Sequence, residues 1–437
     1  MARRARRIAV LMLVVGWLLA LLVQVPSGVH AQPGPAPAAA VPAQAAQAIE
    51  RTELRGVWLT ANDMPTLRDR ERMQASVAQL AALNFNTLYA VAWNGGHAYY
   101  PSPVSEGRGL QSFSYRGLQG QDVLAELADA AHQRGLLLIP WFEFGFMTPP
   151  DGDLARRHPD WLTRKQDGGL TSISAAGEVA WLNPFRPEVQ QLITDLVLEM
   201  VGTSDGDGIQ FDDHMSLPRD FGYDPFTVAL YTKETGKPPP ANPADAAWMR
   251  WRTERITAFM AQLSQAVKAR KPGAIVSVSP NYYDFALKLQ LQDWLTWVRR
   301  GLVDELLIQI YRPDLESFLP QLSRPEVQES QRRIPTAIGI MSGQRTRPAP
   351  LALVQAQVQA ARERQLGVAF FYLESLWNLG SEPREARLAG LAQLFATPAR
   401  RERPTAAAAP GSQAPESLAP PPAPPAAPPP LPPPPGP

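Results

Sequence analysis

The sequence predicts an α/β fold, specifically a (β/α)8 TIM barrel with long βα loops after the second and third strands. Between Arg51 and Arg401, eight short apolar runs typical of strands alternate with segments of helical periodicity. A strand buried on both faces is a continuous apolar run, as at Leu136–Ile139. An open doubly wound sheet is the alternative, but no Gly-x-Gly-x-x-Gly turn follows the first strand.

The predicted elements follow one another regularly along the chain. The expected strands are Gly56–Thr60, Thr87–Ala92, Leu136–Phe142, Gly208–Asp212, Ile275–Ser279, Glu305–Ile310, Thr336–Ile340 and Val368–Tyr372. The expected helices are Arg70–Leu83, Gln121–Arg134, Pro187–Val201, Trp248–Lys271, Leu291–Gly301, Pro350–Gln365 and Glu385–Phe395. Asp122 and Pro187 occupy helix-start positions, and Gly135 and Gly301 follow the last turns, where glycine is favoured. The link between the sixth and seventh strands is the least regular.

The composition excludes several classes of protein. The 437 residues are 45% hydrophobic, enough for a large core, and the formal net charge is +1. A balanced charge lacks the broad positive field used in non-specific nucleic-acid binding, so no nucleic-acid partner is expected. There is no cysteine, which excludes disulfides, thiolate zinc sites and cysteine nucleophiles.

The two ends of the chain do not resemble a packed domain. Residues 1–31 combine four arginines with an apolar run at Ile8–Val25, and they are predicted to be a signal peptide or an uncleaved N-terminal anchor that tethers the protein to the inner membrane. Residues 32–50 form a Pro/Ala/Gln-rich linker, and residues 402–437 a disordered Pro/Ala-rich tail. The barrel is assigned to residues 51–401, and the expected location is the periplasm or cell envelope.

The strongest chemical signal ends the fourth predicted strand, at Asp207–His214. Side chains alternate along a strand, so Gln210 and Asp212 face the barrel axis. Active sites of such barrels lie at the carboxyl ends of the strands, which places Asp212 at the mouth. Asp213 follows at the turn, where it acts in catalysis, caps loop amides or pairs with His214.

Two further acids end strands, Glu143 after the third and Glu374 after the eighth. Adjacent strands lie about 4.8 Å apart, so Glu143 suits the close spacing to Asp212 of a retaining glycosidase. The eighth strand lies across the barrel from the fourth, so Glu374 suits the wider spacing of an inverting enzyme. The candidate catalytic residues are therefore Asp212, Glu143, Glu374 and Asp213.

Other polar and aromatic residues fall at strand ends and in the long loops, where rings can stack on sugars and amides can orient hydroxyls. The candidate substrate-binding residues are Asn62, Trp93, His97, Gln210, His214, Asn281, Tyr282, Gln309 and Tyr311. No cofactor is expected. An Asp-Asp-His cluster can hold a divalent ion, but only one histidine is close in the sequence and no third ligand is evident, so no metal is assigned.

Several motifs occur in an order that resembles a known family. They are Glu53–Thr60, Asn84–Tyr89, Pro140–Glu143, His158–Leu162, Trp181–Pro184 and Asp207–His214. Together, over about Glu53 to Trp377, they resemble the bacterial family 10 glycosylhydrolase-like TIM-barrel proteins, particularly their cyanobacterial branch. The resemblance implies an envelope glycosidase that cleaves peptidoglycan glycan strands stripped of peptides. It supports Asp212 and Asp213 most directly, whereas related branches carry Asn at the position of Glu143.

These observations lead to a hypothesis of an exported glycoside hydrolase that acts on an envelope polysaccharide, with peptidoglycan as the expected substrate. Asp212 would be the nucleophile or base, and Glu143 or Glu374 the proton donor. One alternative is a catalytically inactive barrel that binds glycan or acts as a scaffold. Another is a metal-dependent polysaccharide deacetylase, although the chain has only five histidines.

Overall fold

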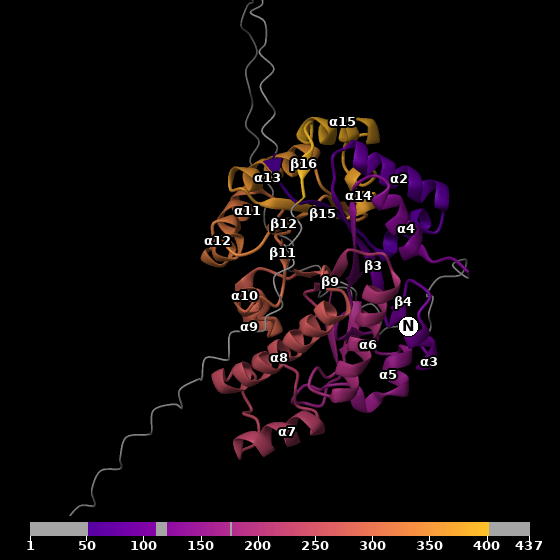
Figure 1. Cartoon of the computed structure of the whole chain (residues 1–437). Coiled ribbons are helices and arrows are strands. Elements are labelled where there is room, and N and C mark those ends of the chain that lie inside the picture. Colours follow the sequence, from indigo (N-terminus) through magenta and orange to yellow (C-terminus); the bar gives the residue numbers. More distant parts are fainter. Residues whose placement is uncertain (1–50, 111–119, 175–176, 402–437) are drawn as a thin grey trace, which may run out of the picture. The chain divides into compact units, whose positions relative to one another are not determined.

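The structure is a computed structural model that describes residues 51–110, 120–174 and 177–401 (Figure 1). The predicted leader, linker and C-terminal tail lie outside these residues. Within the described ranges, no helix combines the length and the apolar content needed to cross a membrane.

Eight parallel strands close into a barrel, which confirms the predicted fold. They are β2 (Arg55–Leu59), β3 (Thr87–Asn94), β5 (Leu137–Phe142), β9 (Gly208–Asp212), β10 (Ile275–Ser279), β11 (Glu305–Gln309), β12 (Thr336–Met341) and β15 (Gly367–Phe371). Each strand pairs with its neighbours in this order, and β15 pairs with β2 to close the ring. The predicted bounds of β9 and β10 are identical to these, and the other six strands differ by one or two residues at an end.

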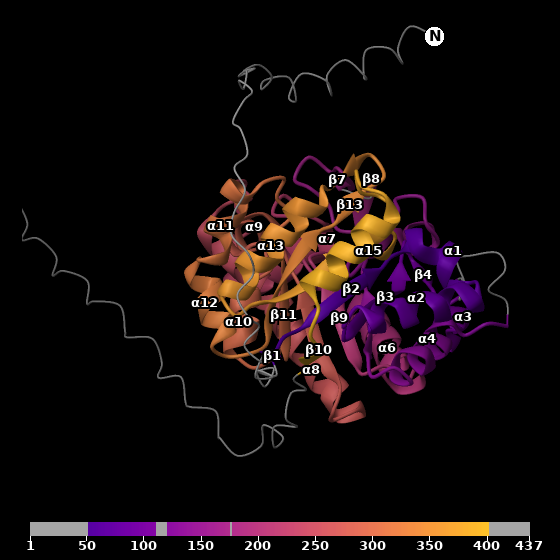
Figure 2. The same cartoon turned by 90° about the horizontal axis from the view of Figure 1, so that it is seen from above.

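Helices surround the strands, as Figure 2 shows from above. Those nearest the predictions are α2 (Arg70–Ala82), α4 (Val123–His132), α6 (Pro187–Thr203), α8 (Ala246–Arg270), α10 (Trp294–Arg299), α13 (Leu351–Glu363) and α15 (Arg384–Leu394). The helix predicted to begin at Leu291 begins later, because Leu291 has a left-handed backbone that ends α9 (Tyr283–Gln290) and Asp293 caps α10. The irregular link after β11 contains α11 (Leu315–Leu322) and α12 (Pro325–Gln331).

The long loops after β3 and β5 carry secondary structure of their own. The first contains β4 (His97–Ala98) and α3 (Pro103–Gly107). The second contains β6 (Met147–Thr148), α5 (Asp153–Arg157), a 3-10 turn at Pro159–Trp161, β7 (Thr171–Ser174) and β8 (Gly177–Trp181), and β6, β8 and β7 form a small sheet. The remaining short elements are β1 (Arg51–Thr52), a 3-10 turn at Ala61–Asp63, α1 (Met64–Leu67), α7 (Pro225–Thr235), β13 (Gly343–Gln344), β14 (Arg347–Pro348), α14 (Leu373–Trp377) and β16 (Ala399–Arg400).

Three barrel strands are each anchored near their start by a hydrogen bond from a main-chain N–H. The acceptor is the side chain of the residue just before a neighbouring strand. Asn86 Oδ1 accepts the N–H of Arg55 at 2.9 Å, Asp207 Oδ2 accepts that of Leu138 at 2.9 Å, and Asp304 Oδ2 accepts that of Val276 at 2.7 Å. Each bond satisfies a buried N–H at the end of the ladder and fixes the register of two strands.

The barrel interior is filled by polar as well as aromatic side chains. Near the strand starts, the Tyr89 hydroxyl donates to Glu305 at 2.7 Å. One layer higher, the Trp58 indole N–H donates to Gln210 Oε1 at 2.6 Å, and the Gln210 amide donates to Ser277 at 2.9 Å. Because these buried groups have partners, the interior is a packed core that supports the residues above it.

Replacing Gly208 by Ala is expected to destabilise the barrel. A Cβ at this position would lie 2.1 Å from the carbonyl oxygen of Ile275 on the adjacent strand β10, so the two backbones would have to separate. Such overpacking costs about 1–3 kcal/mol. Urea unfolding followed by circular dichroism measures the loss. Gly273→Ala is the control, because a Cβ there meets nothing within 4 Å. Equal stability of the two variants would contradict this account.

Candidate functional site

The carboxyl ends of β9, β10 and β11 bring several predicted polar residues together. Asp212 is in register with Ser279 of β10, and Asn281 forms a bridge with Gln309 of β11. Gln309 Nε2 donates to Asp212 Oδ1 at 2.7 Å and to the carbonyl of Ser279 at 2.9 Å. This amide therefore fixes the Asp212 carboxyl relative to the neighbouring strand.

Asp212 and Asp213 are held by different sets of donors. Asp212 is 4% exposed, and its Oδ1 also accepts the N–H of Asp213 at 2.8 Å. Asp213 Oδ2 accepts amide protons from Asn281 at 2.7 Å and from Gln290 at 3.1 Å. The two adjacent carboxyl groups are thus oriented separately.

His214 connects this pair to Glu143. Its Nδ1 lies 3.7 Å from Asp212 Oδ2 and 3.8 Å from Asp213 Oδ1, and it donates to the main-chain carbonyl of Glu143 at 3.0 Å. The Glu143 carboxyl accepts a hydrogen bond from the Asn94 amide. The acids that end β5 and β9 therefore belong to one cluster.

The close approach of the loops after β5 and β9 depends on Gly145. Its φ is +50°, and a Cβ there would lie 2.3 Å from the carbonyl oxygen of His214. Phe146 N–H donates to that oxygen at 3.0 Å. Only glycine permits this backbone contact, which holds His214 beside Glu143.

The environment divides the acids into protonated and ionised groups. Burial raises the pKa of Glu143 to about 7, against the opposing effects of Asn94 and His214. Burial and the neighbouring Asp213 charge raise the pKa of Asp212 well above its ordinary value. Burial alone would raise the pKa of Asp213 as well, but His214 and hydrogen bonds with Asp212 and Gln290 outweigh it and hold that pKa low. The adjacent pair thus carries one negative charge, held mainly by Asp213.

Tyr311 lies beside the same acids. Burial, followed by the charges of Asp212, Asp213 and Glu143, raises the pKa of its hydroxyl well above the usual range. Its ring packs against Phe371, with centroids 5.7 Å apart. A neutral hydroxyl at this position can donate a hydrogen bond to a carboxylate or to a sugar oxygen.

The cluster of Asp212, Asp213 and His214 has the residue types of a metal site, but the histidine nitrogen that faces the acids already makes a hydrogen bond. Potential ligand atoms of Asp212, Asp213 and His214 lie within 4.8 Å of one another. However, His214 Nδ1, which faces both carboxyl groups, carries a proton because it donates to a carbonyl. A protonated ring nitrogen cannot bind a metal. A metal at this position would thus have to displace the hydrogen bond from His214 to the Glu143 carbonyl.

Glu374 belongs to a separate cluster on the same side of the barrel. Its carboxylate lies 2.9 Å from Arg345 Nη2 and accepts the Tyr372 hydroxyl at 3.2 Å. Its N–H donates to Asp63 Oδ1 at 2.9 Å, and burial raises the pKa of Asp63 to about 7. The structure thus ties Glu374 to the loops after β2 and β12, and not to the cluster around Asp212.

The other predicted binding residues lie in varied surroundings. Trp93 is 2% exposed and stacks on Phe142 with centroids 5.8 Å apart, and Gln210 is enclosed within the barrel. His97 is half-buried in β4, where burial lowers its pKa. Asn62 is exposed in the turn after β2, and the Tyr282 ring lies under the Arg312 guanidinium at 5.2 Å. Trp93 and Gln210 are thus buried, and the prediction that they contact substrate is not supported.

Sequence reasoning missed three amides that orient the acids. Asn94 binds Glu143, Gln290 binds Asp213, and Gln292 donates to the Asp212 carbonyl at 3.0 Å. Asn94 ends β3, so the strand-end rule that selected Glu143 could have selected it. Gln290 ends helix α9 and Gln292 follows it, and nothing in their sequence context marks them.

Replacing Glu143 by Gln is expected to flatten the pH dependence of stability. The folded-state pKa of Glu143 is raised from 4.5 to about 7, so between these values the folded protein keeps a proton that the unfolded chain has released. The contribution of Glu143 to the free energy of unfolding therefore falls as the pH rises through this window, by about 1–3 kcal/mol. Urea unfolding between about pH 4.5 and pH 8 tests this. Parallel curves for the parent and the variant would contradict it.

The comparison with protein families identifies the chain. The model of the family described as glycosyl hydrolase-like 10 matches residues 53–361, which include the cluster around Asp212. The chain belongs to this family. Relatives include the glycosyl hydrolase DigH of Escherichia coli (strain K12), 27% identical over 300 residues that cover 60% of this chain and 66% of DigH. The glycosyl hydrolase YngK of Bacillus subtilis (strain 168) is 26% identical over 301 residues that cover 59% of this chain and 54% of YngK. The chain thus matches slightly under two thirds of DigH and about half of YngK.

Solved structures with similar folds support the barrel assignment for this glycosyl hydrolase-like 10 protein. The glycoside hydrolase domain of PgaB (BpsB) from Bordetella bronchiseptica has a TM-score of 0.57 and 14% identity, covering 78% of this chain and 99% of that domain. The catalytic domain of β-amylase from Paenibacillus polymyxa has a TM-score of 0.53 and 9% identity, covering 79% of this chain and 98% of that domain. At these identities the likeness concerns the fold.

Proposed function

We propose that the protein is an exported glycoside hydrolase that cleaves an envelope polysaccharide, namely peptidoglycan glycan strands. The single observation that carries the proposal is the meeting of Glu143 with the Asp212–Asp213 pair at the carboxyl ends of β5 and β9. Glycoside hydrolysis requires one protonated and one ionised carboxyl group at the scissile bond. Membership in a glycosyl hydrolase-like family and the names of DigH and YngK support the reaction class.

The protonation states suggest a role for each acid. Glu143, with a pKa of about 7, is the proton donor to the leaving oxygen. The Asp212–Asp213 pair supplies one negative charge that stabilises the oxocarbenium-like transition state and attacks the sugar carbon or activates water. The amides of Gln309 and Asn281 keep that charge in place. Glu374, bound to Arg345, is not needed for these steps.

Export and the polysaccharide rest on sequence features. The arginine-rich start and apolar run of residues 1–31 support export, either as a cleaved periplasmic form or as a form tethered to the inner membrane. The resemblance to envelope glycosidases supports peptidoglycan as the substrate. N-terminal sequencing after cell fractionation tests export, and full-length protein in the cytosol would contradict it.

The activity is tested by digesting purified sacculi, with and without prior removal of the stem peptides, and by mass spectrometry of the products. We expect glycan fragments of reduced length and the largest yield from peptide-free strands. Binding without new reducing ends would indicate a glycan-binding barrel. Release of acetate without chain cleavage would indicate a deacetylase.

A further inference from the structure

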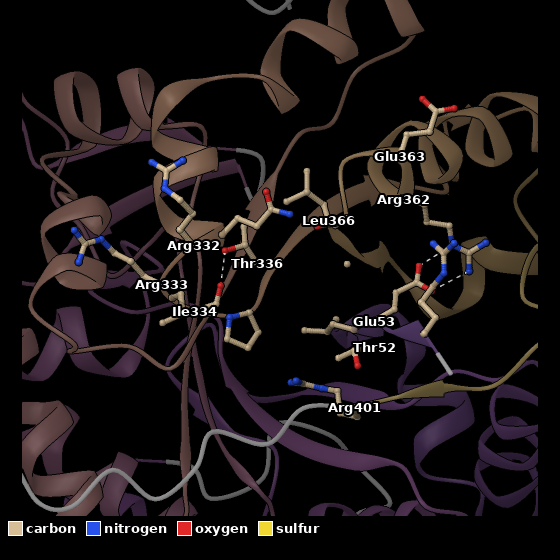
Figure 3. A pocket seen from close by; sticks show the side chains of 16 residues that line it. Thr52, Glu53, Arg332, Arg333, Ile334, Thr336, Arg362, Glu363, Leu366 and Arg401 are labelled. Carbon is tan, nitrogen blue, oxygen red and sulfur yellow. Dashed lines mark hydrogen bonds and ion pairs between the residues drawn. The ribbon is translucent and has the colours of Figure 1, made fainter. Parts of the chain in front are cut away.

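The two ends of the barrel differ in how their polar groups are paired. At the strand starts lies a cavity of about 860 Å³, shown in Figure 3. Two of its arginines are already bound, because Arg362 lies 2.7 Å from Glu53 and Arg401 binds Glu305, and Arg333 is directed away from the space. At the mouth, in contrast, two side-chain donors near the acids have no partner in the part of the chain that the structure describes. A ligand can therefore complete hydrogen bonds at the mouth.

The first of these donors is the Tyr311 hydroxyl. Gln309, two residues earlier, donates to Asp212 Oδ1 at 2.7 Å, and Tyr311 follows it on the same side because side chains alternate. The Tyr311 ring packs on Phe371 with centroids 5.7 Å apart, which fixes its position. Burial and the charges of the nearby acids raise the pKa of Tyr311, so the hydroxyl keeps its proton. It is a neutral donor near the acids, and no described residue accepts its proton.

The second donor is the indole N–H of Trp141. This side chain is 3% exposed, and its N–H has no hydrogen-bond partner within the described ranges. Trp141 lies in β5, two residues before Glu143, and is in register with Gln210, which precedes Asp212 by two residues. Trp141 therefore lies one layer below the acids, on the axis side. An unpaired buried donor costs about 1–3 kcal/mol, so this layer is completed by a ligand group or a water molecule.

The aspartate pair supplies the matching acceptor. Amide donors occupy Oδ2 of Asp213 and Oδ1 of Asp212. The other two oxygens, Asp212 Oδ2 and Asp213 Oδ1, lie 3.7 Å and 3.8 Å from Nδ1 of His214, which donates to a main-chain carbonyl instead. Because a carboxylate oxygen has two lone pairs, the pair can accept one further N–H from a ligand.

An amide group complements this arrangement, because it offers an N–H donor and, on a different atom, a carbonyl acceptor. In a 2-acetamido sugar the amide is attached beside the anomeric carbon, so it reaches the acids together with that carbon. We propose that the site binds this 2-acetamido group and that its carbonyl oxygen attacks the anomeric carbon. The Asp212–Asp213 pair accepts the N–H, Tyr311 donates to the carbonyl oxygen, and Trp141 forms the floor. Because the step needs a glycan at the mouth, it rests on the function proposed above.

The reaction then has two steps, and each group returns to its starting state. First, the carbonyl oxygen bonds to the anomeric carbon as the bond to the leaving oxygen breaks, and Glu143 gives its proton to that leaving oxygen. The acetamido group becomes a cyclic oxazolinium ion, whose positive charge is balanced by the aspartate pair. Second, water attacks the same carbon, its proton passes to the Glu143 carboxylate, and the ring opens. Two displacements at one carbon retain its configuration, and neither aspartate bonds to the sugar.

Nuclear magnetic resonance of the first products, with the full-length protein and peptide-free glycan strands, tests the stereochemistry. We expect the new reducing ends to appear with retained configuration. Chemically de-N-acetylated strands should be cleaved more slowly on the order of 10³-fold, because the attacking group is lost. Re-N-acetylation should restore the rate, which controls for damage to the strands.

The outcomes separate this step from the proposed function. Inversion, a covalent sugar ester on either aspartate, or equal cleavage of N-acetylated and de-N-acetylated strands would overturn the step and leave the proposed function standing. If no glycan is cleaved, the proposed function is wrong and the step is wrong with it.

A thiazoline analogue and a tyrosine variant test the same site independently. The thiazolines of N-acetylglucosamine and N-acetylmuramic acid resemble the cyclic ion, so in isothermal titration at least one should bind about 10²-fold more tightly than its parent sugar. Tyr311→Phe should lower kcat on N-acetylated strands about 10²-fold, the loss that follows removal of a donor to a reacting oxygen. Tyr372→Phe is the matched control, because the Tyr372 hydroxyl binds Glu374 at 3.2 Å, and it should keep the parent's kcat. Thiazolines that bind no tighter than the sugars, or equal kcat of Tyr311→Phe and the parent, would overturn the proposal.

Discussion

Asp212→Asn is expected to lower kcat on peptide-free glycan strands on the order of 10³-fold or more, the loss that follows removal of a principal catalytic group. Asparagine keeps the oxygen that accepts hydrogen bonds from Gln309 and the Asp213 N–H, so folding should persist. The variant fixes the single negative charge on Asp213, where Asn281 and Gln290 hold it. The charge then cannot move onto the side chain of residue 212, which faces the barrel axis.

Asp213→Asn is the matched comparison and should cost less. Burial still raises the pKa of Asp212 in this variant, but without the neighbouring charge that pKa falls, which favours ionisation of Asp212 itself. Turnover is measured by the release of reducing ends at saturating substrate, and folding by circular dichroism. Near-normal turnover of Asp212→Asn, combined with a large loss in Asp213→Asn, would assign the catalytic charge to Asp213 instead.

Glu143→Gln is expected to produce the second large effect, and its size should depend on the leaving group. Hydrolysis of natural glycosidic bonds should fall about 10²–10⁴-fold, the usual contribution of general acid catalysis. Aryl glycosides with acidic phenols need little protonation, so their cleavage should fall far less. In the parent, activity should decline as the pH rises through about 7, because Glu143 then loses its proton.

Glu374→Gln is the control for this prediction. Glu374 was also predicted to end a barrel strand, but it lies in α14, and its carboxylate binds Arg345 and Tyr372. The variant should retain the parent's decline of activity with pH and its dependence on the leaving group. If Glu374→Gln loses natural-substrate activity while Glu143→Gln keeps it, Glu374 is the proton donor.

Periodicity predicted the barrel well because each strand is a short apolar run separated by a helix. The same alternation predicted that Asp212 ends its strand facing the barrel axis, and in the structure Asp212 is in register with Ser279 of β10. It fails near Trp93, where a register irregularity between Val91 and Trp93 leaves the ring packed on Phe142.

The surroundings of Glu374 could not be predicted from the sequence. Its partner Arg345 lies between the short strands β13 and β14, in a loop whose path depends on tertiary packing. The amides of Gln290 and Gln292 reach the acids for a similar reason, because the left-handed Leu291 turns the chain back at the end of α9. Strand alternation specifies which side chains face the barrel axis, whereas loop geometry decides their partners.

The pairing of β1 with β16 has a consequence for how the chain can be reconnected. Arg51 lies in register with Ala399 and Thr52 with Arg400, so the first and last described strands run side by side in parallel. At about 3.3 Å per residue, a short loop would join the end of β16 to the start of β1. A circular permutant with this join, opened at the exposed tip between β13 and β14, should close the same barrel, because every pairing of β2 with β15 and β3 is kept.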